Sequence, residues 1–186
     1  VMEESYEINY IAVKGGSIKI RYSVSPTGGV PEENIVSRSD KPHEDFRRVW
    51  SKLANIARRF LEMPLENSGG GQLQVWVSKV NFPVHKDCGE GMQIIVQLSG
   101  FTNCTQALQV VTHKFYRRAA EYIDLPTGGK IPCQELLPDE IKTMKELQKE
   151  AFAYAYHCKR EQPTVEEAQN AYESGAYPDE IVRDKA

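Results

Sequence analysis

The sequence predicts an α+β domain in which an antiparallel sheet of about five strands carries two long helices on one face. Several segments alternate apolar and polar residues with a period of two, which is typical of strands covered on one side only. Two longer segments carry apolar stripes with a period of 3.6 residues, which is typical of amphipathic helices. The order of these segments is β-β-α-β-β-β-α, which indicates helices gathered on one face of an antiparallel sheet.

The first two strands are predicted at residues 5–13 and 17–25 as a β-hairpin. Gly15 and Gly16 between them supply the positive φ angles that a two-residue hairpin turn requires. Residues 25–40 are rich in Pro, Gly and Ser, and this composition predicts a loop.

The first helix is predicted over residues 41–63, KPHEDFRRVWSKLANIARRFLEM. The residue before Pro64 disfavours the helical conformation, so we expect the helix to end at Met63. Its apolar residues lie on one side and its cations on the other. The basic side consists of Arg47, Arg48, Lys52, Arg58 and Arg59.

Three further strands are predicted at about 72–80, 91–99 and 107–115, although the end of the third is also compatible with a helix over KFYRRAAEYI. The second long helix is predicted over residues 138–160, because a proline opens it and another follows it. After it, Thr164 and Glu167 have the spacing of a capping box for a short helix.

The bulk composition predicts one domain over residues 1–162 followed by an acidic tail over 163–186. A chain of 186 residues with 40% hydrophobic content suffices for one core. The net charge is −3, but residues 161–186 carry seven acidic and two basic side chains. The body is therefore slightly basic and the tail clearly acidic.

Composition also predicts a soluble protein in a reducing compartment. Mean hydropathy is −0.51, and no apolar run approaches the roughly 18–20 residues that span a bilayer. The first residues are acidic, unlike a secretory signal. The four cysteines form no CxxC pair and match no small disulfide scaffold, which favours reduced thiols and a cytoplasmic location.

Three surfaces are candidates for binding nucleic acid, each with a simply solvated surface as the alternative. The basic side of the first helix could contact phosphates. The polar face of the sheet, with Lys19, Arg21 and Trp76, combines charge with a stacking aromatic side chain. The segment 113–118, which includes Arg117 and Arg118, mixes cations with aromatic residues.

No motif predicts a catalytic residue, a cofactor or a metal. The sequence lacks GxSxG, P-loop and GxGxxG patterns, and the predicted strands hold almost no carboxylates for a two-metal nuclease. His85 and Cys88 have the spacing of half a zinc site, but no second close pair accompanies them.

Three segments resemble a group of small, uncharacterised bacteriophage and prophage proteins. KPHEDFRRVWSKLANIARRFLEMP resembles that group's KPH-x-DF stretch, and ELLPDEIKTMKELQKEAFAYAYHCKREQ resembles its C-terminal helix. VQLSGFTNCTQALQVVTH is also similar. The group's helix commonly runs into a GKR-like end, whereas Cys158-Lys159-Arg160 lacks the glycine and the tail after Gln162 is additional. Such proteins are typically encoded among replication and recombination genes, which implies an accessory role near phage DNA and assigns no functional residue.

These observations leave three hypotheses open. The first is a non-enzymatic phage or prophage accessory protein in the bacterial cytoplasm that binds nucleic acid, or phage or host replication and recombination proteins, through the basic helix side. The second is a protein–protein interaction module acting on a host protein, favoured by the negative net charge and the acidic tail. The third is an enzyme whose site is assembled from distant residues. Self-association through an edge or face of the sheet is a further alternative, which would make a homo-oligomer.

Overall fold

A computed structural model describes residues 5–25, 29–63, 73–100, 106–118, 123–124, 130–131 and 134–160. This part of the chain forms two helices and eleven strands. The helices are α1 (Glu44–Phe60) and α2 (Pro138–Ala155). The strands are β1 (Ser5–Lys14), β2 (Ser17–Ser25), β3 (Glu32–Arg38), β4 (Gln74–Asn81), β5 (Val84–His85), β6 (Gly89–Ser99), β7 (Leu108–Val111), β8 (Phe115–Tyr116), β9 (Ile123–Asp124), β10 (Lys130–Ile131) and β11 (Gln134–Glu135).

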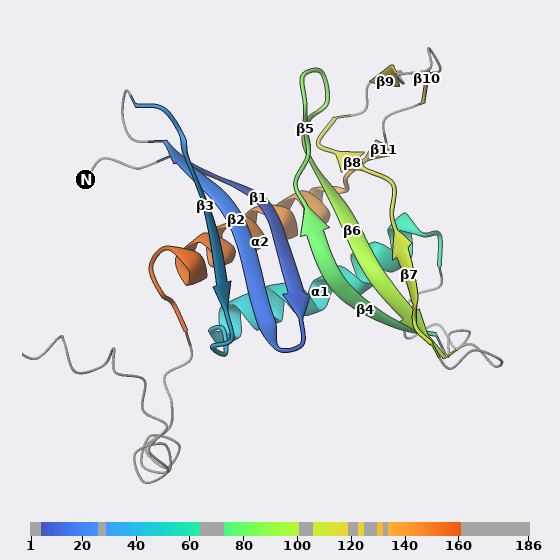
Figure 1. Ribbon diagram of the computed structural model, residues 1–186. Helices are drawn as coiled ribbons and strands as arrows, with labels where there is room; N and C mark the ends of the chain where they lie inside the picture. The colour runs from blue at the N-terminus through green and yellow to red at the C-terminus, as the bar shows by residue number, and fades with distance from the viewer. Residues whose placement is uncertain are drawn as a thin grey trace, which may run out of the picture.

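The fold class predicted from the sequence is confirmed. A mostly antiparallel nine-stranded sheet has the order β11-β8-β6-β4-β1-β2-β3, with β5 and β7 also paired to β6. Both helices lie behind this sheet in Figure 1 and pack on the same face. The other face is open in the same view. The sheet has more strands than predicted because β3 and several two-residue strands add to the five long or medium ones.

The hairpin formed by β1 and β2 agrees with the prediction. The turn residues Gly15 and Gly16 have φ angles of 57° and 80°, the left-handed values that this turn type requires. Strand β1 also pairs with β4, but only over Tyr10–Ala12. This short pairing joins two wings of the sheet, β1–β3 and β4–β8 (Figure 1).

The prediction of a loop across residues 25–40 is wrong for Glu32–Arg38. This segment is strand β3, which pairs with β2 at seven successive positions, from Ile18 opposite Arg38 to Val24 opposite Glu32. Its sequence, EENIVSR, has few apolar residues because it is the last strand of the sheet order and buries little. Hydrogen bonds to the backbone of β2 hold residues 32–38 as a strand, and the hydropathy of the segment does not reveal such pairing.

Helix α1 lies within the predicted range 41–63 but is three residues shorter at each end. The Nδ1 atom of His43 accepts a hydrogen bond of 3.3 Å from the backbone N–H of Asp45 and caps the first turn. At the other end, Glu62 adopts a left-handed φ of 55°, and the Met63 N–H donates to the Arg58 carbonyl at 2.7 Å. This tight reversal follows directly on the last helical residue, Phe60.

The strands that follow α1 agree with the prediction in position. Strands β4, β6 and β7 lie within or close to the three predicted ranges, and β5 occupies part of the connection between β4 and β6. Phe115 and Tyr116 form strand β8, so the helical alternative is wrong at these two residues. Helix α2 ends at Ala155 instead of residue 160. The short helix predicted near Thr164 and the acidic tail lie outside the described residues.

The hydrophobic core lies between the sheet and the two helices. Both layers supply fully buried side chains, among them Ile11, Ile20, Leu53, Ile94 and Leu147. The packing therefore uses the apolar stripe of α1 as predicted from its period. Neither of the described helices is long and apolar enough to cross a membrane.

Candidate nucleic-acid interface

The five cations of α1 do not form one exposed basic face. Arg58 is buried, with 2% of its surface exposed, and its guanidinium donates a hydrogen bond of 2.6 Å to the Leu73 carbonyl. The Arg59 guanidinium donates to both carboxylate oxygens of Glu140, which is itself buried on α2. Arg59 also lies over the rings of Phe60 and Phe115, at 5.0 and 4.9 Å from their centroids.

Two further cations of α1 are engaged by neighbouring acids. The Lys52 ammonium lies 3.4 Å from the Glu146 carboxylate of α2, and Arg48 lies 3.1 Å from Asp45 one turn away. Helix α2 packs beside α1 and brings its acids to the cations, an arrangement that a periodicity analysis of one helix does not show. The expectation of a continuous basic face is thus wrong for Arg58, and it overstates the charge that Arg59 and Lys52 offer to a ligand.

The open face of the sheet carries the second predicted group. Lys19 and Arg21 lie on β2 between the inward-facing Ile18, Ile20 and Tyr22, so their side chains stand on the side away from the helices. On β4, Trp76 lies between two residues that pack on the core and exposes 63% of its surface. The sequence pattern had placed all three on this face, and the structure agrees.

Lys79 joins this face, although alternation along the strand does not predict it. A register irregularity falls between Val77 and Lys79, where β4 pairs with β6. Such a bulge changes which side of the sheet the following residues face. Val80 is consequently fully buried, and the Lys79 ammonium lies 4.4 Å from the ring centroid of Tyr10 on β1. The sequence signal for this bulge is Val80, an apolar residue that breaks the alternation set by Val75 and Val77.

The charges on this face are less neutralised than those on α1. Arg21 forms an exposed ion pair with Glu33, at 2.6 Å. Lys19 and Lys79 form no ion pair with any of the described residues. Side-chain amides lie between the cations, since Gln93 pairs with Asn81 across β6 and β4. The outer face therefore presents an aromatic ring, three cations of which one is paired with Glu33, and neutral hydrogen-bonding groups.

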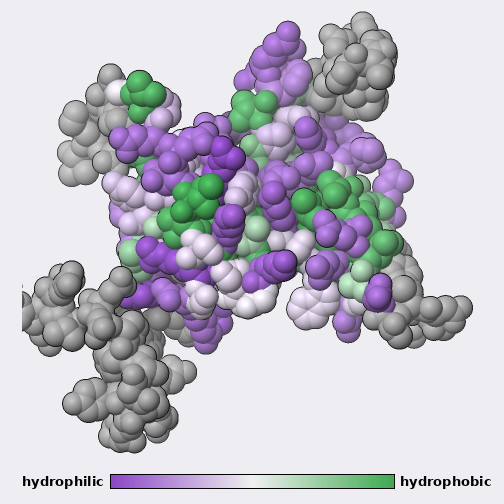
Figure 2. Space-filling model, viewed as in Figure 1, coloured by the Kyte–Doolittle hydropathy of each residue, from purple (hydrophilic) through white to green (hydrophobic). Residues whose placement is uncertain are grey.

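Figure 2 shows the same face in space-filling form. Hydrophobic surface gathers in two areas, one over β3 and the other over β6 and β7, with hydrophilic residues between them. The exposed apolar residues of these strands include Ile35 and Val111. The cations thus occupy the centre of a face that is mixed in character instead of uniformly polar.

The third predicted surface, residues 113–118, does not present its aromatic residues. Phe115 and Tyr116 are buried, and the Phe115 ring stacks on Phe60 with centroids 3.7 Å apart. Arg117 lies 3.7 Å from Glu90, and this segment sits beside β6 at the opposite end from Lys19. Stacking of nucleic-acid bases on these rings would require the core to open, so the predicted mixture of cations and accessible rings is wrong here.

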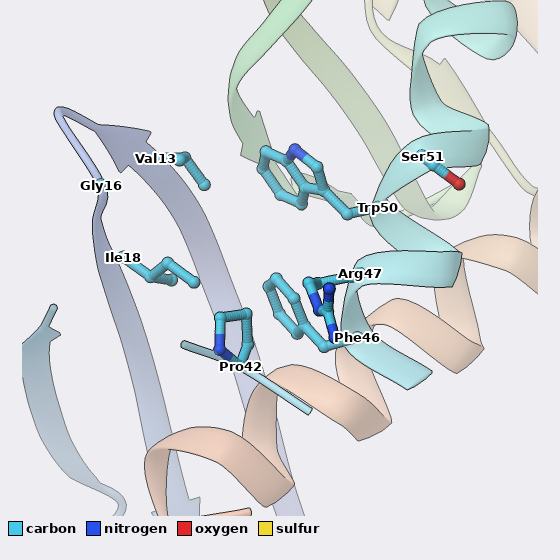
Figure 3. A pocket seen from close by; sticks show the side chains of 8 residues that line it. All are labelled: Val13, Gly16, Ile18, Pro42, Phe46, Arg47, Trp50 and Ser51. Atoms are coloured by element: carbon cyan, nitrogen blue, oxygen red, sulfur yellow. The ribbon is translucent and has the colours of Figure 1, made fainter. Parts of the chain in front are cut away.

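A small cavity lies between the β1–β2 turn and the start of α1 (Figure 3). Its volume is about 270 Å³, and Phe46 and Trp50 form one side with stacked rings whose centroids lie 5.9 Å apart. Arg47 and Ser51 add polar atoms to an otherwise mostly apolar lining. The cavity belongs to the helix side of the molecule and shares no residue with the open sheet face.

The structure also bears on the predictions for the cysteines and for a zinc site. Cys88 is fully buried and disulfide-bonded, so the prediction that the cysteines are reduced is wrong for Cys88. Its sulfur is not available to bind a metal with His85, whose Nδ1 atom accepts a hydrogen bond from Asp87 N–H. Cys158 is an exposed free thiol. No cluster of three or more metal-binding side chains occurs within the described part of the chain.

Comparison with known proteins adds no assignment: no family model, no curated protein and no solved structure matches the chain.

Proposed function

We propose that this protein binds single-stranded nucleic acid on the open face of its sheet. The observation that carries the proposal is Trp76, which exposes 63% of its surface on a sheet face that neither helix covers. Exposed aromatic rings on sheets provide stacking surfaces for unpaired bases, whatever the sequence of the bases.

The cations on the same face as Trp76 supply the second requirement of such a surface. Lys19 and Arg21 lie on β2 and Lys79 lies on β4, on either side of β1, and all three attract the phosphate backbone. Three phosphate contacts predict a slope of roughly −2 for the logarithm of affinity against the logarithm of salt concentration. The amides of Gln93 and Gln97 add donors and acceptors for sugars and bases without adding charge.

The biological setting is part of the same proposal and rests on the resemblance to phage and prophage proteins. Replication and recombination expose single strands, so a sheet that binds unpaired bases fits that setting. We propose an accessory binding role in that setting, in the cytoplasm of a bacterial host. The disulfide at Cys88 is unusual for a cytoplasmic protein, because such compartments keep thiols reduced.

The direct test is a salt titration of binding to a labelled single strand and to a duplex, followed by fluorescence anisotropy. We expect affinity for the single strand at low salt, with a slope near −2 and weaker binding to the duplex. The double variant Lys19→Ala/Lys79→Ala should reduce the slope to roughly −0.7, since one cation remains. No measurable binding at low salt would refute the proposal.

A matched variant on the other side of the molecule separates the sheet face from α1. Arg48→Ala/Lys52→Ala also removes two cations from exposed or partly exposed positions, but on the helix layer. We expect this variant to bind single strands with unchanged slope. If it loses binding while the sheet variant retains it, the interface lies on α1 and the sheet assignment is wrong.

A further inference from the structure

Strand β3 ends the sheet and leaves one of its edges unpaired within the described residues. It is last in the strand order, and it pairs with β2 along its whole length from Glu32 to Arg38. Figure 1 shows it at the border of the sheet, beyond β2. An edge of this kind offers backbone N–H and C=O groups to another strand.

This edge lacks most of the features that usually prevent pairing. Its sequence contains neither proline nor lysine, and its register with β2 has no bulge. At its centre Ile35 exposes 57% of its surface on the open face of the sheet. Edge strands that stay monomeric are commonly short, bulged, or marked by charges and Pro. Strand β3 is straight and seven residues long, and its charged residues Glu32, Glu33 and Arg38 lie near its two ends, away from the exposed isoleucine at its centre.

The residues of β3 are also complementary to a second copy of themselves. When two such strands run antiparallel with Ile35 opposite Ile35, residue 32 of each strand faces residue 38 of the other. Glu32 then lies opposite Arg38 twice, once on each side of the two-fold axis. The central pair is apolar, so both charge and hydropathy match in this register. A register shifted by one residue lacks this match, because Ile35 of one copy would then face the opposite side of the sheet from Ile35 of the other.

We propose that two copies of this chain pair through β3, antiparallel and centred on Ile35, to form a dimer with one continuous sheet. The contact is isologous, because the same strand serves both copies, and it closes without leaving a further edge at β3. A two-fold axis perpendicular to the sheet keeps the open faces of both copies on the same side. The inward-facing Val36 and the helix layers likewise stay together on the other side.

The two Glu32–Arg38 pairs favour a second copy of this chain as the partner over an unrelated strand. An arbitrary peptide would satisfy the backbone groups, but it would not place a cation opposite Glu32 and an anion opposite Arg38 with an apolar residue midway between them. Arg38 already leans over the helix side, where its guanidinium lies 3.5 Å from the Ala155 carbonyl. Glu32 is exposed on that same side, so a neighbouring arginine can reach it.

The first experiment measures molecular mass by sedimentation over roughly 5–500 µM, since contacts made by one strand pair belong to the small interfaces that dissociate readily. We expect a monomer–dimer equilibrium for the native chain. Ile35→Lys should shift it to monomer, because two ammonium groups would meet on the axis. Val30→Lys is the control, since Val30 is an exposed apolar residue just outside the paired segment. A monomer at every concentration, or a dimer unaffected by Ile35→Lys, would overturn the proposal.

The second experiment uses charge reversal and does not depend on one substitution being tolerated. Glu32→Arg places two arginines opposite each other, and Arg38→Glu places two glutamates opposite each other, so each variant alone should be monomeric. An equimolar mixture should form a heterodimer, because every pair across the axis then has opposite signs. Circular dichroism of each variant verifies folding. A mixture that stays monomeric while both variants are folded would contradict the β3 pairing.

Discussion

The two faces of the sheet carry similar charges and use them differently. On the helix side, Arg58 is buried and Arg59 is held by Glu140 on the neighbouring helix. On the open side, Lys19 and Lys79 extend from strands without an acidic partner among the described residues, and Trp76 is exposed on the same strand as Lys79. The comparison teaches that a cluster of cations in a sequence indicates a binding surface only where the fold places no acidic side chain close enough to pair with them.

The largest effect is expected from breaking the charge pair on the helix side. Arg59→Met leaves the buried carboxylate of Glu140 without its cation, and we expect the free energy of unfolding to fall by about 3 kcal/mol. Urea denaturation measures this change. The double variant Arg59→Met/Glu140→Gln should recover much of the loss, because no unpaired charge then remains buried. An Arg59→Met protein as stable as the native chain would mean that Arg59 is free for a ligand after all.

On the open side, a comparable loss should appear in binding and not in stability. Trp76→Ala removes the stacking ring, and we expect the affinity for a single strand to fall by about 1–3 kcal/mol, with a change in unfolding free energy within about 0.5 kcal/mol. Trp50→Phe is the control on the other layer, since Trp50 and Phe46 are both on α1 and their rings stack there. Anisotropy titrations and thermal melts measure the two quantities. Equal binding by both variants would remove Trp76 from the interface.

A smaller and opposite effect should follow from removing an acid on each face. Glu33→Gln releases Arg21 from its exposed ion pair, so we expect affinity to rise about twofold to fivefold. Glu146→Gln releases Lys52 on the helix side in the same way. The second substitution should leave affinity unchanged if only the sheet binds. A rise for Glu146→Gln alone would place the ligand on the helix layer.

The smallest effect concerns the acid dependence of stability on the helix side. Hydrogen bonding from Lys159 lowers the pKa of Asp45 below its usual value, with His43 and Arg48 contributing. A carboxylate with a lowered pKa in the folded state adds stability above its unfolded pKa, and this contribution is lost as pH falls through the folded pKa. Asp45→Asn should therefore flatten the decline of the melting temperature below about pH 4. An unchanged pH profile would show that this contact adds nothing to stability.

Much of the fold was predictable because local signals and tertiary packing agree. The turn at Gly15 and Gly16, the stripe of α1 and the alternation in β2 each specify a structure within a few residues of sequence. Strand β3 was missed because its pairing with β2 requires no hydrophobic pattern of its own. Lys79 was missed because one bulge changes the side that every later residue of β4 faces.

The sequence alone therefore determined the layered α+β architecture, the positions of both helices and the residues that line the core. Periodicity carries that information because a helix or strand must bury its apolar side wherever it lies. Only the tertiary structure decided which charges remain available. Ion pairs form between residues far apart in sequence, as between Arg59 and Glu140, so the choice between a packed cation and an exposed one depends on which elements become neighbours.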